Sequence, residues 1–268
     1  MDINKVLAGL DRLFAENRMN EVENYLTEAL TEADNEGDYA AKLSILNELI
    51  GFYRVISEFD KAIRYGEQAV QILKSMQMDG TIPYATTLLN IANAHRAAGN
   101  LQESLKLYER IEEIYTENLK PGDFLMASFY NNIALLYQEM GDFENAAASL
   151  RKALAIAETY DNAASEIATT YSNLGVSLLR LGRNEEAKEM LKTAIEKYEM
   201  IGERGYHFSS ALSAMGEAYY REGDFQKSLE YYEAAASEIH SVFGENAAYK
   251  VMQENISAVK ASIRGNNV

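Results

Sequence analysis

The sequence predicts an all-α fold, a solenoid of about six antiparallel helix pairs that ends in a capping helix. Three observations predict it: a motif that recurs at nearly constant spacing, apolar residues at helical intervals before each recurrence, and a turn signal at the recurrence itself. One helix pair cannot bury its apolar face alone, so repeated pairs must stack on one another to form a continuous core.

The repeat is counted from one reference position, which Gly141 occupies in the segment NNIALLYQEMGDFENAA (residues 131–147). Successive reference positions lie 40, 42, 42, 41 and 41 residues apart. Small or apolar residues recur seven positions before the reference position, and small residues recur five and twelve positions after it. Agreement at several fixed offsets identifies a repeat protein. The six reference positions are Asn17, Ser57, Gly99, Gly141, Gly182 and Gly223.

Apolar residues before each reference position predict the first helix of a pair. They lie eleven, eight, seven and four positions before it, which is the i, i+3, i+4, i+7 spacing of one helical face. In the fourth repeat these residues are Tyr130, Ile133, Ala134 and Tyr137.

The reference glycine predicts the turn, because glycine suits the left-handed backbone just past a helix end. The residue that follows it, Asn100, Asp142 or Asp224, can accept a hydrogen bond from the first amides of the second helix. Small residues in that second helix allow two backbones to approach closely. Pro83 and Pro121 fall between pairs, where a helix can end.

The pairs follow one another along a single predicted domain that spans residues 1–268. The first pair is atypical, because Leu10 and Asn17 replace the small residue and the glycine. The segment ENAAYKVMQENISAVKASIR resembles a first helix with no second helix after it, so we expect it to cover the end of the stack. The predicted pairs are 3–37, 38–80, 81–121, 122–162, 163–203 and 204–244, and the capping helix is 245–264.

These residues resemble the tetratricopeptide repeat, whose pattern is L-G-x-x-Y, then G-D-[FY], then alanines in the second helix. Its best copies are the segment around Gly141 and AMGEAYYREGDFQKSLEYYEAAA (residues 214–236), and the resemblance extends from residue 3 to about 264. The family's tryptophan is absent, and Tyr130, Tyr171 or an aliphatic residue stands in its place.

The period exceeds the common tetratricopeptide length of about 34 residues. The longer form is similar to the repeats of kinesin light chains and of bacterial peptide-sensing regulators. The resemblance implies a right-handed superhelix whose first helices line a concave groove for extended peptides or helices.

Composition narrows the classes of function. The chain has 41 acidic and 25 basic residues, and its net charge of −16 repels phosphate backbones, so nucleic acid is not an expected partner. The absence of cysteine excludes disulfides and thiolate metal sites. Charged residues interrupt the N-terminal segment, and no other stretch approaches the ~18 apolar residues of a membrane span. We therefore expect a cytoplasmic protein with no membrane partner.

The sequence offers no arrangement of residues that indicates catalysis. His95, His207 and His240 are isolated from one another and from any nucleophile, and His95 stands in a column that other repeats fill with tyrosine. Residues 32–43 imitate the start of a calcium loop, but Leu43 stands where a bidentate glutamate should close it. We expect a protein that is not an enzyme and that has no cofactor or metal ion.

A polar face on the first helices is the candidate partner-binding site. An asparagine side chain offers a donor and an acceptor that match a peptide unit, and arginine adds forked bonds to carboxylates, so an acidic ligand is favoured. The resemblance implies that Asn90, Asn132 and Asn173 contact a peptide backbone, while Tyr220 would contact an apolar anchor. The candidate residues are Asn47, Arg54, Asn90, Asn93, Arg96, Asn131, Asn132, Gln138, Asn173, Arg180, Glu217, Tyr220 and Arg221.

The same residues have a structural alternative. Asparagines in this column can link neighbouring helices, and the arginines lie in the last turns of their helices, where a positive charge interacts favourably with the helix dipole.

The predicted function is a non-enzymatic scaffold or adaptor that binds a peptide, tail or helix of another protein in the groove. The alternatives are a structural subunit that assembles through solenoid ends or a convex face, and a peptide-responsive regulator that acts through a partner. The sequence selects no oligomeric state.

Overall fold

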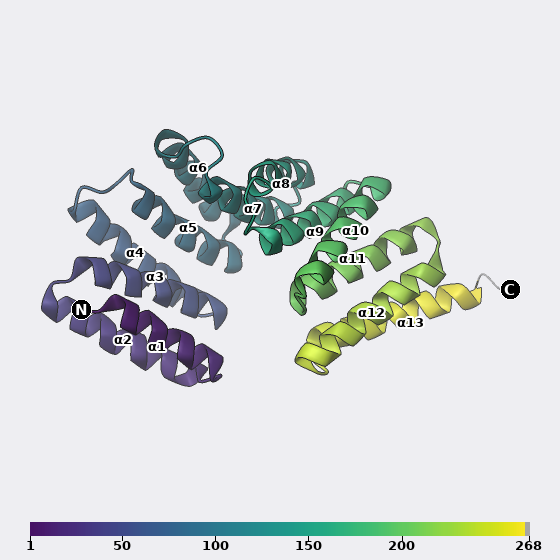
Figure 1. Cartoon of the computed structure of the whole chain (residues 1–268), viewed down its shortest axis with the longest axis horizontal. Helices are drawn as coiled ribbons and strands as arrows, with labels where there is room; N and C mark the ends of the chain where they lie inside the picture. Colours follow the sequence, from purple (N-terminus) through teal and green to yellow (C-terminus); the bar gives the residue numbers. More distant parts are fainter. Residues whose placement is uncertain (266–268) are drawn as a thin grey trace. The chain divides into compact units, whose positions relative to one another are not determined.

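A computed structural model describes residues 1–265, which form thirteen α-helices and no strand (Figure 1). The predicted all-α fold is therefore confirmed, and the helix boundaries agree with the six predicted pairs and the final helix. The helices are α1 (Ile3–Ala15), α2 (Met19–Glu36), α3 (Tyr39–Val55), α4 (Phe59–Ser75), α5 (Ile82–Ala97), α6 (Leu101–Asn118), α7 (Phe124–Glu139), α8 (Phe143–Ala157), α9 (Ala164–Arg180), α10 (Asn184–Ile201), α11 (Tyr206–Glu222), α12 (Phe225–Phe243) and α13 (Ala247–Gly265).

The chain divides into two compact units, Met1–Pro121 with α1–α6 and a second unit that begins at Gly122 and holds α7–α13. The prediction of one domain over residues 1–268 stays a prediction. In the first unit each helix packs on the next, and the first helices α3 and α5 also contact each other directly. Its core includes Leu26, Ile45 and Leu49, none of which has any exposed surface.

The second unit repeats this arrangement. Its pairs are α7–α8, α9–α10 and α11–α12, and the first helix α9 contacts both α7 and α11. The last helix, α13, packs on α12, where Met252, Ile256 and Val259 join a core cluster with Tyr232 and other residues of the second unit. This helix covers apolar surface of α12, as expected of a capping helix.

The reference positions hold the left-handed backbone that the sequence predicts. In the fourth repeat the Gly141 amide donates to the Gln138 carbonyl at 3.0 Å and the Asp142 amide donates to the Tyr137 carbonyl at 2.8 Å, which closes the end of α7. The φ angles are 56° at Asn17, 62° at Ser57, 80° at Gly99, 79° at Gly141, 74° at Gly182 and 80° at Gly223.

The side-chain cap predicted at the start of the second helix forms in two repeats and is absent in one. The Asp142 carboxylate accepts a hydrogen bond from the Asn145 amide at 3.2 Å, and the Asp224 carboxylate accepts one from the Lys227 amide at 3.1 Å. The Asn100 side chain makes no such bond in the described structure. Helix α6 begins there without a side-chain cap, so an asparagine alone at this position does not fix the capping geometry.

Small residues lie where two helices approach closely, as predicted. Ala62, Ala146 and Ala187 of the second helices are fully buried. A Cβ atom added to Gly175 of α9 would lie 2.5 Å from the Leu191 Cγ atom of α10 and 3.2 Å from the Ala187 carbonyl oxygen. A larger residue at position 175 would therefore force α9 and α10 apart.

Candidate partner-binding face

In the first unit, α3 and α5 bring two of the candidate asparagines together. The Asn90 amide donates to the Asn47 side-chain oxygen at 2.8 Å, and the Asn47 amide donates to the Leu43 carbonyl at 3.0 Å. The Asn47 amide also lies 3.4 Å from the Thr87 hydroxyl. Both asparagines are half-buried. They link adjacent first helices, which is the structural alternative considered for them, and they still form part of the face that these helices present.

The remaining candidates of the first unit differ in accessibility. The Asn93 side-chain oxygen accepts a hydrogen bond from the Tyr108 hydroxyl at 2.7 Å, so it connects α5 to α6. Arg96 is half-buried near the end of α5. Arg54 is exposed near the end of α3 and makes no ion pair with another described residue. Arg54 is therefore the more exposed of the two candidate arginines in this unit.

An apolar hollow of about 420 Å³ adjoins the Asn47–Asn90 pair. Its wall includes Leu43 of α3, Met78 of the turn after α4, and Ile82 of α5, with Asn47 at its polar side. This hollow is not among the features predicted from the sequence. Met78 of its wall lies 21 residues after Ser57, and the residues at this offset in the next three repeats are Lys120, Asn162 and Glu203, so the repeat pattern does not predict the hollow.

In the second unit, α7 and α9 are linked in a similar way. The Thr170 hydroxyl donates to the Asn131 side-chain oxygen at 2.9 Å, and the Gln138 amide donates to the Ser177 hydroxyl at 2.8 Å and to the Asn173 carbonyl at 3.0 Å. Asn132 bonds within its own helix, donating to the Ser128 carbonyl at 2.8 Å. The Asn173 side chain is half-buried on the same face.

Glu217 of α11 joins two of the candidate arginines. It accepts from the guanidinium groups of Arg180 on α9 and Arg221 on α11, each at 2.6 Å. Arg221 also donates to the Leu179 carbonyl of α9. One carboxylate between two guanidinium groups leaves an excess positive charge at this place. The sequence could place Glu217 on the polar face, but its role depends on the register of two neighbouring helices.

Tyr220 connects the same face to the last helix. Its hydroxyl lies 3.2 Å from the Ser262 hydroxyl of α13, and its ring centroid lies 5.3 Å from that of Phe225. The side chain is 39% exposed, so part of the ring remains available to a ligand.

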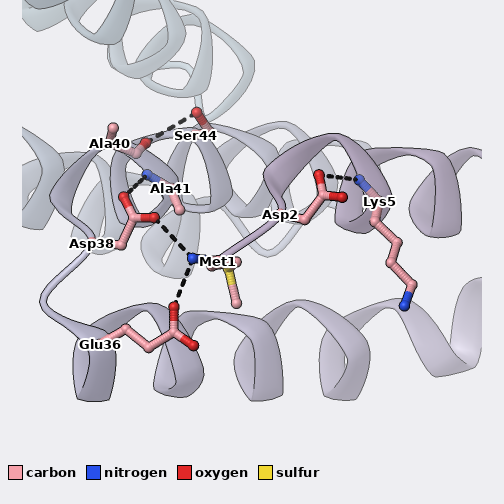
Figure 2. Close-up of polar contacts among 8 residues, drawn as sticks. All are labelled: Met1, Asp2, Lys5, Glu36, Asp38, Ala40, Ala41 and Ser44. Carbon is pink, nitrogen blue, oxygen red and sulfur yellow. Dashed lines mark hydrogen bonds and ion pairs between the residues drawn. The ribbon is translucent and has the colours of Figure 1, made fainter.

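The acidic turn that resembles a calcium loop is occupied by protein contacts. The Met1 amino group donates to Glu36 at 2.6 Å and to Asp38 at 3.2 Å (Figure 2). Asp38 also accepts a hydrogen bond from the Ala41 amide at 3.0 Å, and this backbone bond is the main reason that the pKa of Asp38 is lowered. Asp34 pairs with Lys42. Glu36, Asp38 and Asp34 therefore each have a positively charged partner within the protein.

The histidines lie apart from one another, as the sequence suggests. His95 is half-buried on α5, burial lowers its pKa, and its Nδ1 atom has no hydrogen-bond partner among the described residues. His207 and His240 are exposed on α11 and α12.

Among residues 1–265, no group of three or more His, Cys, Asp or Glu side chains is placed to hold a metal ion. No helix in this range is long and apolar enough to cross a membrane.

The repeat geometry agrees with a comparison against known protein families. A sequence model described as tetratricopeptide repeat matches residues 41–117 and 125–200, and a second model of the same description matches residues 172–241. The chain belongs to the tetratricopeptide repeat family. Its repeats of 40 to 42 residues are each one helix pair with a left-handed turn, and α13 follows the last of them.

Within this family the repeats are similar to those of kinesin light chain-related proteins. Protein KINESIN LIGHT CHAIN-RELATED 1 of Arabidopsis thaliana is 26% identical over 168 residues, which are 62% of this chain and 27% of that protein. The chain therefore spans about a quarter of the length of the curated relatives it matches.

Two solved structures share the fold of these tetratricopeptide repeats. BtubC (BKLC) from P. vanneervenii superposes with a TM-score of 0.67 at 22% identity, over 76% of this chain and 82% of that chain. NprR in complex with its cognate peptide NprX superposes with a TM-score of 0.67 at 14% identity, over 99% of this chain and 77% of that chain. Similarity at these identities shows the fold alone.

Proposed function

We propose that this tetratricopeptide repeat protein is a non-enzymatic interaction scaffold whose first-helix faces bind an extended peptide or tail of another protein. The observation that carries the proposal lies in the first unit. The half-buried Asn47–Asn90 amide pair adjoins an apolar hollow, and the exposed Arg54 lies on the same helix, about 10 Å from Asn47 along α3. This combination offers hydrogen bonds, an apolar anchor site and a positive charge within reach of a short extended segment.

Two further observations support the same proposal. The second unit has its own linked polar face with excess positive charge at the Arg180–Glu217–Arg221 group. NprR, which shares the fold, has been crystallised with a peptide bound. An acidic ligand suits both units, because exposed arginines add charge-assisted hydrogen bonds to carboxylates. A cytoplasmic location and the absence of a nucleic-acid partner stay predictions from composition.

Selection from a phage-displayed library of random peptides tests the proposal. Peptides selected on the wild-type chain should bind the variant Arg54→Glu at least about tenfold more weakly, because the charge reversal replaces attraction by repulsion. The double variant Asn47→Ala/Asn90→Ala should weaken binding as well. The control Lys192→Glu makes the same charge change on α10, a second helix, where the lysine side chain is 73% exposed, and should leave binding unchanged.

Circular dichroism establishes that each variant is folded before binding is compared. If the selected peptides bind wild type and Arg54→Glu equally, or if Lys192→Glu weakens them as much, the first-helix face is not the binding surface. A regulator that responds to a peptide would use the same face, so the same variants test its binding surface as well.

A structural subunit is the second candidate, and an exposed apolar edge of the second unit favours it. Met200 is 84% exposed, Tyr206 is 67% exposed and Phe243 is 49% exposed, at the ends of α10 and α12 and the start of α11. If this edge assembles copies of the chain, the molar mass by light scattering should rise with concentration. The variant Met200→Glu/Phe243→Glu should then remain monomeric. A wild-type chain that is monomeric at all concentrations would remove this candidate.

A further inference from the structure

We propose that a groove between α4, α5 and α6 of the first unit docks an acidic amphipathic helix of a partner protein. This site lies on the opposite side of α5 from the asparagine face, so it is independent of the proposed function. The groove lining includes Tyr84, Leu88, Ile91 and His95 of α5, whereas the other face of the same helix carries Asn90 and Asn93. Tyr84 begins the first of these two rows of side chains and Thr86 begins the second. Two residues apart in a helix are about 200° apart around its axis.

The groove is large and its floor is apolar. Its volume is about 940 Å³, and Tyr84, Leu88 and Ile91 form a floor in which each side chain is 8% exposed or less. Half-buried Ile63 and Val70 of α4 form one wall, and half-buried Leu107 of α6 contributes to the other. The lining along α4 runs from Ile63 to Lys74, which is about 16 Å or three helical turns.

The lining favours a helix over an extended chain. Its exposed polar side chains, such as Gln68 and Gln71, lie at the rim, and the floor offers the Tyr84 hydroxyl but no side-chain amide of the kind that Asn47 and Asn90 supply on the other face. An extended backbone on this floor would leave N–H and C=O groups unpaired against apolar side chains. A helix satisfies these groups internally and presents apolar residues at i, i+3, i+4 and i+7.

The charges around the groove favour an acidic partner. Arg64 and Lys74 are exposed at its rim and make no ion pair with another described residue, while Lys42 already pairs with Asp34. Glu67 is the one acidic side chain among the lining residues. The lining holds three basic side chains, Lys42, Arg64 and Lys74, against this one glutamate, in a chain with 25 basic and 41 acidic residues. An acidic helix therefore meets attraction here that most of the chain does not offer.

The test uses a displayed library of 15-residue helices that share a leucine stripe and have a randomised polar face. Selection on the full chain should recover helices enriched in aspartate and glutamate. The double variant Arg64→Glu/Lys74→Glu, which changes exposed side chains only, should weaken their binding by about 10- to 100-fold. Leu107→Glu should weaken it through the apolar wall.

Two controls keep this proposal separate from the peptide-binding function. Arg54→Glu lies on the asparagine face and should leave binding of the selected helices unchanged, and a proline in the middle of a selected helix should abolish its binding. Recovery of no helix, recovery without acidic enrichment, or equal binding by Arg64→Glu/Lys74→Glu would overturn the proposal. Loss of binding in Arg54→Glu would instead assign the helices to the other face.

Discussion

At the residue scale, the turns of the first two repeats hold side chains in a backbone conformation that favours glycine. Ser57 has a φ of 62°, where the last four repeats have glycine. A left-handed backbone costs an L-residue about 1 kcal/mol, so Ser57→Gly should raise the free energy of unfolding by about 0.5–1 kcal/mol. Urea unfolding measures the change.

Gly141→Ala is the matched control for this turn. A Cβ atom added at Gly141 has nothing within 4 Å, so any loss of stability comes from its φ of 79° and not from a clash. We expect a loss of about 1 kcal/mol. If Ser57→Gly destabilises the protein instead, the serine side chain contributes to the turn more than the backbone conformation costs.

Glu48 of α3 carries a second prediction at this scale. Burial, and to a lesser extent the nearby Asp11, raises the pKa of Glu48 above its ordinary value of 4.5. Because the folded state disfavours the carboxylate, Glu48 lowers stability once the pH rises above this ordinary value, and the loss is complete above the raised pKa. Glu48→Gln should therefore raise the melting temperature at pH 7 and change it little at pH 4.

The control for Glu48 is Glu189→Gln, which changes an exposed glutamate of α10. Thermal unfolding of both variants at the two pH values separates a local effect from a general effect of removing negative charge from an acidic chain. Equal gains from the two variants at pH 7 would assign the effect to net charge.

At the element scale, the close approach of α9 and α10 depends on Gly175. An added Cβ would collide with Leu191, so Gly175→Ala should lower the free energy of unfolding by about 1–3 kcal/mol. The additional change Leu191→Ala should cost less in this background than in the wild type, because the two side chains share one space. Gly51→Ala in α3 is the control. It meets nothing within 4 Å and should stabilise that helix by about 0.5–1 kcal/mol.

The helices and turns could be predicted because their requirements are local. A reference position needs a left-handed backbone, and the spacing of glycines records that need even where Asn17 and Ser57 replace them. Contacts between helices were less predictable. The Asn47–Asn90 bond spans 43 residues, and the bridging role of Glu217 depends on how α9 and α11 pack.

Side chains at one offset can also behave differently in different repeats. Asp142 and Asp224 cap their helices and Asn100 does not, although all three follow a reference glycine. The groove between α4, α5 and α6 and the hollow beside Asn47 depend on how neighbouring helices pack, and the repeat period does not predict that packing. The candidate face was thus predictable as a polar stripe. The hollow beside it, and which of its arginines are exposed without an ion pair, could be seen only in the structure.

At the scale of the whole molecule, the division at Pro121 and Gly122 predicts that the second unit folds without the first. Two of its core clusters consist entirely of residues from α7 to α13 and their connecting turns, and α13 covers α12 at the end of the chain. Residues 122–268 expressed alone should therefore show helical circular dichroism and a cooperative thermal transition. In this fragment Val259→Asp should destabilise by more than about 3 kcal/mol, because it buries a charge at a site that is 1% exposed.

The surface control for Val259 is Lys260→Asp, at the next position, where the lysine side chain is 47% exposed. It breaks an ion pair with Glu233 but buries no charge, so the fragment should keep its transition with a small loss of stability. If residues 122–268 are unfolded alone while the full chain is folded, the repeats depend on one another as the predicted single domain requires. If the fragment folds and only Val259→Asp removes its transition, the second unit is an independent folding unit whose stability depends on α13, because neighbouring repeats supply the core that one helix pair lacks.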